Sequence, residues 1–169
     1  NRDQMKNLVL ILLAMLSLIS CDDDFATGSD AQPVASADTL HMGTILAGNS
    51  SPTYQLKRYN PYSKELNLSS IVLRSAPSSG FRMNVDGMNG TSFTNSDLLR
   101  IASGDSLFVF VEATFQPEGK GIQHHLDYVD VSCNGKTTTI VLDAVSKEVR
   151  KLQGYVVTAN EVWDMASEI

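Results

Sequence analysis

The sequence SLFVFVEATF, residues 106–115, alternates between two sets of side chains and decides the fold class. One set is Leu107, Val109, Val111, Ala113 and Phe115, and the other is Phe108, Phe110, Glu112 and Thr114. Because successive side chains of a β-strand point to opposite faces of a sheet, the apolar set predicts a face packed on a core. Pro117 follows and is expected to end the strand.

Similar short runs lie on both sides of this strand. They are residues 39–45, 53–59, 66–73, 81–85, 128–133 and 137–145. The parity of the apolar positions changes between Leu68 and Ile71, which predicts a β-bulge. Asn134-Gly135 separates the last two runs and predicts a hairpin with a type I′ turn. Residues 86–96 are rich in Gly and Asn and are predicted to form a loop.

Roughly seven strands over about 110 residues, without a convincing helix between them, predict an all-β fold. The expected architecture is an immunoglobulin-like, two-sheet antiparallel β-sandwich over residues 38–146. The Cys…Trp…Cys pattern of antibody domains is absent from the sequence. Cys133 falls at an inward position of its predicted strand and is expected to be a small buried hydrophobic residue.

Residues 1–20 have the features of a helical secretory signal peptide. Lys6 precedes a run of twelve residues, Leu8 to Ile19, that is interrupted only by Ser17. As a helix this run spans about 18 Å, short of the roughly 30 Å hydrocarbon core of a bilayer. A basic residue, a short apolar run and a small residue before the cleavage site are typical of signal peptides. A buried core helix is the alternative interpretation.

Leu18-Ile19-Ser20-Cys21 resembles the bacterial lipobox. The resemblance implies cleavage before Cys21, thioether lipidation of its sulfur and acylation of the new amino group. Several acyl chains anchor a protein stably, whereas a single chain is marginal. The membrane is therefore the first expected partner. With Cys21 lipidated, Cys133 has no cysteine left to pair with.

Residues 21–37 are small and polar and predict a flexible tether. Asp22, Asp23 and Asp24 follow Cys21 directly and resemble the surface-export signals of Bacteroidales-type lipoproteins. The resemblance implies an outer-membrane protein on the cell surface, with the periplasmic face as the alternative. A solvated spacer is the simpler interpretation, and three consecutive carboxylates on a tether do not form a calcium loop.

Four segments carry a wider resemblance: DTLHMGTILAG, KRYNPYSKELNLSSIVL, FRMNVDGMNGTSF and SLFVFVEATF. They are similar to an N-terminal immunoglobulin-like, abnormal-spindle-like domain of Bacteroidales-type surface lipoproteins. In that family a right-handed parallel β-helix often follows the domain. The resemblance implies no catalytic residues. Residues 147–169 are interpreted as a C-terminal tail or as the start of a truncated next module.

Several motifs suggest chemistry that the rest of the sequence does not support. Gly104-Asp105-Ser106-Leu107 spells the motif of one lipase family, but no Asp-x-x-His follows, so a turn before a strand is expected. His124, His125 and Asp127 suggest a metal, yet adjacent strand side chains diverge, and a solvated loop is expected instead. We therefore predict no catalytic residue, no metal and no cofactor.

Three acidic residues, Glu112, Asp130 and Asp143, fall at outward positions and are expected on solvated sheet faces. Thr39 and Ser106 follow Asp38 and Asp105, and each Asp-Ser/Thr-aliphatic triplet resembles an O-glycosylation acceptor of the same bacteria. The net charge of −6 and the lack of a run of more than two basic residues argue against nucleic acid as a partner.

The sequence thus predicts a non-enzymatic, lipid-anchored cell-envelope protein. The β-sandwich would act as a stalk or as an interaction module with a protein or glycan ligand. Two alternatives stay open. The domain could be an accessory part of a glycan-binding or carbohydrate-active β-helix protein, or it could be a pilin-like subunit.

Overall fold

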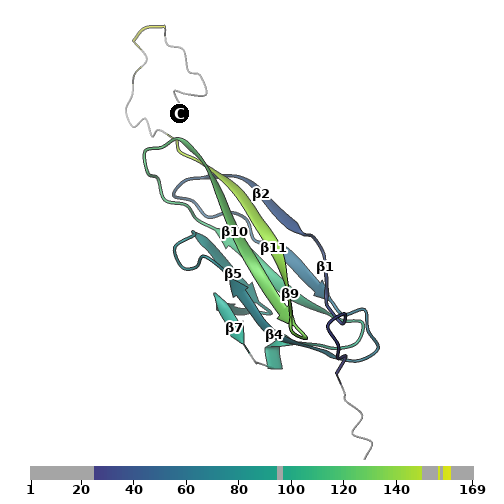
Figure 1. The fold of residues 1–169 in the computed structure, drawn as a ribbon. Helices are drawn as coiled ribbons and strands as arrows, with labels where there is room; N and C mark the ends of the chain where they lie inside the picture. The colour runs from purple at the N-terminus through teal and green to yellow at the C-terminus, as the bar shows by residue number, and fades with distance from the viewer. Residues whose placement is uncertain (1–24, 95–96, 150–155, 157, 161–169) are drawn as a thin grey trace, which may run out of the picture.

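A computed structural model describes residues 25–94, 97–149, 156 and 158–160. Two β-sheets pack face to face, and the long strands run along the axis of the molecule (Figure 1). Within the described residues, the one helical element is the 3₁₀ turn η1 (Asp97–Leu99). Among these residues no helix is long and apolar enough to cross a membrane.

Each sheet is assembled from strands far apart in the sequence. The first sheet has the order β1 (Val34–Ala35), β3 (Tyr54–Tyr59), β9 (Ser106–Ala113), β5 (Phe81–Val85), β6 (Met88–Gly90). The second has the order β2 (Thr39–Leu46), β11 (Lys136–Lys147), β10 (Ile122–Cys133), β4 (Leu66–Leu73), β7 (Ser92–Thr94), and β8 (Arg100–Ile101) also pairs with β4. We call them the five-stranded and the six-stranded sheet.

This strand order is that of an immunoglobulin-like sandwich, as predicted. In that fold strands A, B, E and D form one sheet and strands C, F and G the other. Here β1, β3, β9 and β5 correspond to A, B, E and D, and β4, β10 and β11 correspond to C, F and G. The first strand is divided between the sheets. Its continuation β2 pairs with β11 in parallel, the one departure from antiparallel pairing between the described strands.

The alternation in residues 106–115 is confirmed. Leu107, Val109, Val111 and Ala113 of β9 are at most 2% exposed and lie in the core between the sheets. The facing residues of the six-stranded sheet are equally buried: Leu66, Leu68, Ile71, Leu73, Val129, Val131, Cys133, Ile140, Leu142 and Ala144. Cys133 is fully buried, and burial raises the pKa of its thiol.

The predicted hairpin is also confirmed. Asn134 and Gly135 have φ values of 47° and 76°, as the two central residues of a type I′ turn require. The β10–β11 ladder extends from the pair Cys133–Lys136 at the turn to the pair Ile122–Lys147. The ladder is longer than predicted. Residues 122–126 of β10 are partly or largely exposed and lack a continuous apolar face, so their sequence gives no clear strand signal.

The predicted bulge lies where the parity changes. Cys133 pairs with Leu68 whereas Ser132 pairs with Ser70, so Ser69 is the extra residue of β4. The bulge lets Leu68 and Ile71 both face the core.

The structure differs from the sequence-based prediction at residues 86–96. Its Gly- and Asn-rich sequence predicts a loop, but the segment contains the short strands β6 and β7. β6 pairs with β5 in the five-stranded sheet, and β7 pairs with β4 in the six-stranded sheet. Strands of three residues are too short to give an alternating pattern in the sequence.

Residues 25–37, the described part of the predicted tether, lie against the sandwich. Asn134 Nδ2 donates hydrogen bonds to the carbonyls of Ala26 and Ala31, at 3.0 and 2.8 Å. Ala31 is 7% exposed, and β1 pairs with β3. Small side chains let this segment close one end of the sandwich. The side-chain amide of Asn134, in the hairpin turn, gives two of its backbone carbonyls a hydrogen-bond donor. The flexible-tether prediction therefore does not hold for these residues.

Arg58 is a charged residue inside the core. It lies on the inward face of β3 and is 2% exposed. Burial lowers the pKa of its guanidinium to about 10, although the carboxylate of Asp38 acts in the opposite direction. Among the described residues, none accepts a hydrogen bond from its Nε or Nη2. A buried donor without a partner costs about 1–3 kcal/mol.

Replacing a core leucine should test the packing. We expect Leu68→Ala in β4 to lower the free energy of unfolding by about 2–5 kcal/mol, because the side chain is fully buried. The matched control is Leu126→Ala in β10, where the side chain is 57% exposed and the change should stay within about 0.5 kcal/mol. Urea unfolding measures both. Equal losses in the two variants would contradict the assigned burial.

Replacing Arg58 should not weaken the fold. We expect Arg58→Met to leave the free energy of unfolding unchanged or to raise it by about 1–3 kcal/mol at pH 7, because the unpartnered buried donors disappear. Above pH 10 the unfolded guanidinium binds more protons than the folded one. Wild-type stability therefore rises with pH there, and the advantage of the variant shrinks.

Urea unfolding at neutral pH and above pH 10 measures this difference. Gln55→Met on the exposed side of the same strand is the control, because it removes no titratable group, and it should show no such pH dependence. A loss of several kcal/mol in Arg58→Met at pH 7 would mean that the guanidinium is well partnered.

Candidate functional site

The residues with the most specific sequence motif lie outside the described part of the chain. These are the predicted lipidation site Cys21 and the acidic residues Asp22, Asp23 and Asp24. The signal peptide predicted over residues 1–20 lies outside it as well. Lipidation and export therefore stay predictions.

The two candidate glycosylation residues are each at the start of a strand. Thr39 is the first residue of β2 in the six-stranded sheet, and Ser106 is the first residue of β9 in the five-stranded sheet. Both are partly exposed. The structure does not bring them together, and their modification stays a prediction.

The histidine pair is part of a strand and not of a loop, which corrects the prediction. His124 and His125 lie in β10. The His125 ring stacks on Phe115, with 3.7 Å between ring centroids, and Nε2 is 2.8 Å from the hydroxyl of Ser146. Burial lowers the pKa of His125. No group of three or more His, Cys, Asp or Glu residues that could hold a metal occurs among the described residues.

The lipase-like motif is a turn, as predicted. Gly104 has a φ of 73° and donates its N–H to the Asn60 carbonyl at 3.1 Å. The Asp105 carboxylate accepts a hydrogen bond from the backbone N–H of Ser106 at 2.7 Å. The motif thus turns the chain into β9.

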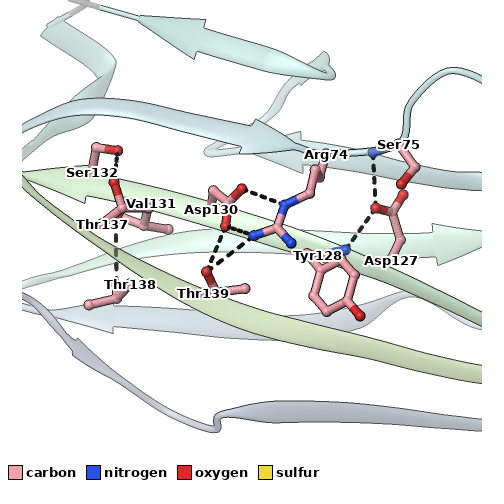
Figure 2. A network of polar contacts seen from close by, with 10 residues as sticks. All are labelled: Arg74, Ser75, Asp127, Tyr128, Asp130, Val131, Ser132, Thr137, Thr138 and Thr139. Carbon is pink, nitrogen blue, oxygen red and sulfur yellow. Dashed lines mark hydrogen bonds and ion pairs between the residues drawn. The ribbon is translucent and has the colours of Figure 1, made fainter.

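The acidic residues predicted to face solvent do so, and each is paired. On the six-stranded sheet Arg74 donates from Nε and Nη2 to the two carboxylate oxygens of Asp130, at 2.9 and 2.6 Å, and lies over the Tyr128 ring at 4.4 Å (Figure 2). This bond from Arg74 lowers the pKa of Asp130. A carboxylate oxygen of Asp143 lies 2.8 Å from Nδ1 of His41.

The outer side of the five-stranded sheet carries a cavity of about 680 Å³. This lies within the range of about 300–1,000 Å³ that is typical of small-molecule sites. Six of its lining residues carry the functional groups used below: Thr53, Arg82, Asn84, Asn89, Phe110 and Glu112. We call it the outer-face cavity.

Two rows of cross-strand neighbours form the floor of this cavity. In one row Arg82 of β5 lies opposite Glu112 of β9. In the other, Asn84 of β5 lies between Phe110 of β9 and Asn89 of β6. Because these residues alternate with core residues along β5 and β9, the buried face of the sheet fixes their direction.

The Arg82–Glu112 pair is held in a hydrogen-bonded network. Arg82 Nη2 lies 3.2 Å from the Glu112 carboxylate, and Nη1 donates to the Thr114 hydroxyl at 2.7 Å. Thr53 donates its hydroxyl to the other oxygen of Glu112. The hydrogen bonds from Thr53 and then from Arg82 lower the pKa of Glu112. The carboxylate is therefore ionised at neutral pH, and the pair carries no net charge.

The second row combines amides with an aromatic surface. Asn84 Nδ2 donates to Oδ1 of Asn89 at 3.0 Å. The Phe110 ring stacks with Phe108 at 6.4 Å between centroids, with 19° between the ring planes. Lys57 lies over the Phe108 ring at 5.3 Å. The floor of the cavity thus combines the ring of Phe110 with charged and amide side chains.

Sequence reasoning placed Phe108, Phe110 and Glu112 on one face of their strand but assigned no site there. The signal that could have found it is an aromatic pair on the side of the strand that faces away from the core. Arg82 and Asn84 alternate in FRMNV with the apolar residues of that segment, so the sequence could place them on the outer face as well. Their positions opposite Glu112 and Phe110 depend on the pairing of β5 with β9, which the sequence alone does not specify.

The layers and strand order define the class as an immunoglobulin-like β-sandwich domain. No protein-family model matches the chain, and no curated protein matches it.

Several solved structures are similar to this chain at low sequence identity. A protein of unknown function from Porphyromonas gingivalis W83 is 17% identical with a TM-score of 0.47, and the match covers 68% of this chain and 47% of that chain. An ASH/PapD-like domain of human CEP192 is 13% identical with a TM-score of 0.40 and coverages of 75% and 92%.

The CooA pilin subunit of enterotoxigenic Escherichia coli is 12% identical with a TM-score of 0.38 and coverages of 67% and 91%. This chain spans less than half of the length of the Porphyromonas protein. Because the identities and TM-scores are low, the fold assignment rests on the strand order described above.

The Arg82–Glu112 pair should show in an acid titration. We expect the Glu112 carboxyl to titrate below the usual value of about 4.3, because Thr53 and Arg82 stabilise its ionised form. In Arg82→Ala the midpoint should rise toward that value. NMR of the side-chain carboxyl carbons measures it. Arg74→Ala on the other sheet is the control, and a shift of the Glu112 midpoint in that variant would contradict the assignment.

Proposed function

We propose that this chain is a non-enzymatic, lipid-anchored cell-envelope protein whose β-sandwich acts as a stalk and as an interaction module. The lipobox-like sequence ending at Cys21 supports the anchor. The shape of the sandwich and the position of its ends support the stalk. The outer-face cavity supports the interaction role.

The observation that carries the stalk is the separation of the two ends of the described chain. Phe25 pairs with Glu65, and Asn134 binds Ala26, so the first described residues lie at the hairpin end of the sandwich. Lys147 lies at the other end of β11, and Figure 1 displays the two ends at opposite poles. Twelve residues of β-strand extend about 40 Å.

This separation gives the anchor a mechanical purpose. A lipid at Cys21 would hold the hairpin end near the membrane, because only Asp22, Asp23 and Asp24 lie between it and the docked residue Phe25. Residues beyond Lys147 would then be held away from the bilayer by the length of the sandwich. We place the protein in the outer membrane at the cell surface, with the periplasmic face as the alternative.

A second candidate function is an accessory domain of a glycan-binding or carbohydrate-active protein. The observation that favours it is the combination of aromatic, amide and paired charged groups in the outer-face cavity. The two candidates are compatible, since a stalk can also hold a ligand.

Metabolic labelling with palmitate tests the anchor. We expect the wild-type chain to incorporate the label and to fractionate with membranes, and Cys21→Ala to lose the label to background. Cys133→Ala removes the other cysteine, which is buried, and should label like the wild type.

Unchanged labelling and membrane association in Cys21→Ala would overturn the anchor. Protease treatment of intact cells then distinguishes the faces. Cleavage without permeabilisation places the sandwich at the cell surface, and cleavage only after permeabilisation places it in the periplasm.

A further inference from the structure

We propose that the outer-face cavity binds a neutral saccharide. This inference names a ligand class for the interaction role proposed above and rests on that role, but it does not depend on the lipid anchor. It rests on the volume of the cavity, the Phe110 ring in its floor, and the kind and charge of the polar side chains beside that ring.

The shape favours a small molecule held in a hollow over a flat protein contact. The volume of about 680 Å³ leaves room for more than one sugar ring. A stable protein partner usually covers about 800 Å² on each side, an area far wider than this one cavity. The hollow lies over β9, β5 and β6, away from the hairpin end where the N-terminal segment docks.

The floor offers an aromatic face to a sugar ring. Phe110 lines the cavity, and Phe108 stacks beside it along the same strand. One face of a pyranose ring presents several C–H groups, which carry a small positive charge. The face of an aromatic ring is negative, so the two surfaces attract each other and exclude water.

The polar groups of the floor suit hydroxyl groups. A sugar hydroxyl both donates and accepts hydrogen bonds. Arg82 supplies donors, Glu112 supplies acceptors, and the amides of Asn84 and Asn89 supply both kinds. A planar carboxylate or amide side chain presents two polar atoms side by side. It can therefore form hydrogen bonds with two neighbouring hydroxyls of one sugar ring.

The charge of the site selects against acidic sugars. Arg82 is neutralised by Glu112 at 3.2 Å, so the cavity has no unpaired positive charge from this pair for a carboxylate or sulfate. An acidic ligand would bring its charge close to the ionised Glu112, which is unfavourable. A neutral hexose or pentose chain meets neither problem.

The polar groups are oriented before a ligand arrives. Arg82 Nη1 is held by the Thr114 hydroxyl, and Asn84 accepts a hydrogen bond from the Gly87 backbone N–H at 2.8 Å. Asn84 also donates to Asn89. Groups fixed in this way lose little conformational entropy on binding, which favours affinity.

The test uses an array of neutral gluco-, galacto-, manno- and xylo-oligosaccharides beside sialylated, uronic-acid and sulfated ones. The full chain is purified in a detergent without a sugar head group, so that the detergent does not compete. Isothermal titration with a retained oligosaccharide then gives the affinity. We expect retention of at least one neutral series and none of the acidic ones.

Two site variants and one matched control locate the binding. Arg82→Ala and Asn84→Ala should each weaken binding by about tenfold or more, the size expected when hydrogen bonds to a ligand are lost. Arg74→Ala removes an equivalent arginine–carboxylate pair on the other sheet, which does not line the cavity. Its affinity should equal that of the wild type, and thermal unfolding checks that all variants are folded.

Three outcomes would overturn the inference. They are no retention of any neutral oligosaccharide at millimolar concentration, retention of acidic glycans only, and equal weakening in Arg74→Ala and Arg82→Ala. A failure of binding with palmitate labelling intact removes the saccharide site and leaves the anchored stalk. A failure of labelling with saccharide binding intact does the reverse.

Discussion

The position of β9 between β3 and β5 is the constraint on which the rest of the structure depends. Val109 and Val111 face the six-stranded sheet and are fully buried, so the strand cannot rotate or shift by one residue. The same constraint directs Phe110 and Glu112 outward. One alternating sequence therefore builds the core on one side and the floor of the outer-face cavity on the other.

The elements predicted from the sequence are those with strong local signals. The alternation in residues 106–115, the Asn134-Gly135 turn and the bulge after Leu68 depend on neighbours in the chain, and they lie as predicted. The two short strands β6 and β7 and the docked segment 25–37 depend on contacts with distant residues. Their sequences are Gly-rich or small and polar, which locally resembles a loop.

The candidate site shows the same division more sharply. The outward residues of β9 were visible in the sequence, but a cavity requires that β5 lies beside β9 and that β6 follows on β5. Arg82 and Glu112 are thirty residues apart in the chain and meet only through that pairing. Composition could supply the functional groups of the site, whereas topology alone brings them together.

The divided first strand has a consequence for a domain that carries load. β2 and β11 run in parallel, and the chain enters β2 at Thr39 and leaves β11 at Lys147, toward opposite poles. A force pulling the two ends of the chain apart would act along these strands once the contacts of residues 25–37 yield. The hydrogen bonds between Thr39–Leu46 and β11 would then be sheared together instead of being opened one at a time. Such a geometry resists extension, so a sandwich pulled at its two ends would transmit tension while staying folded.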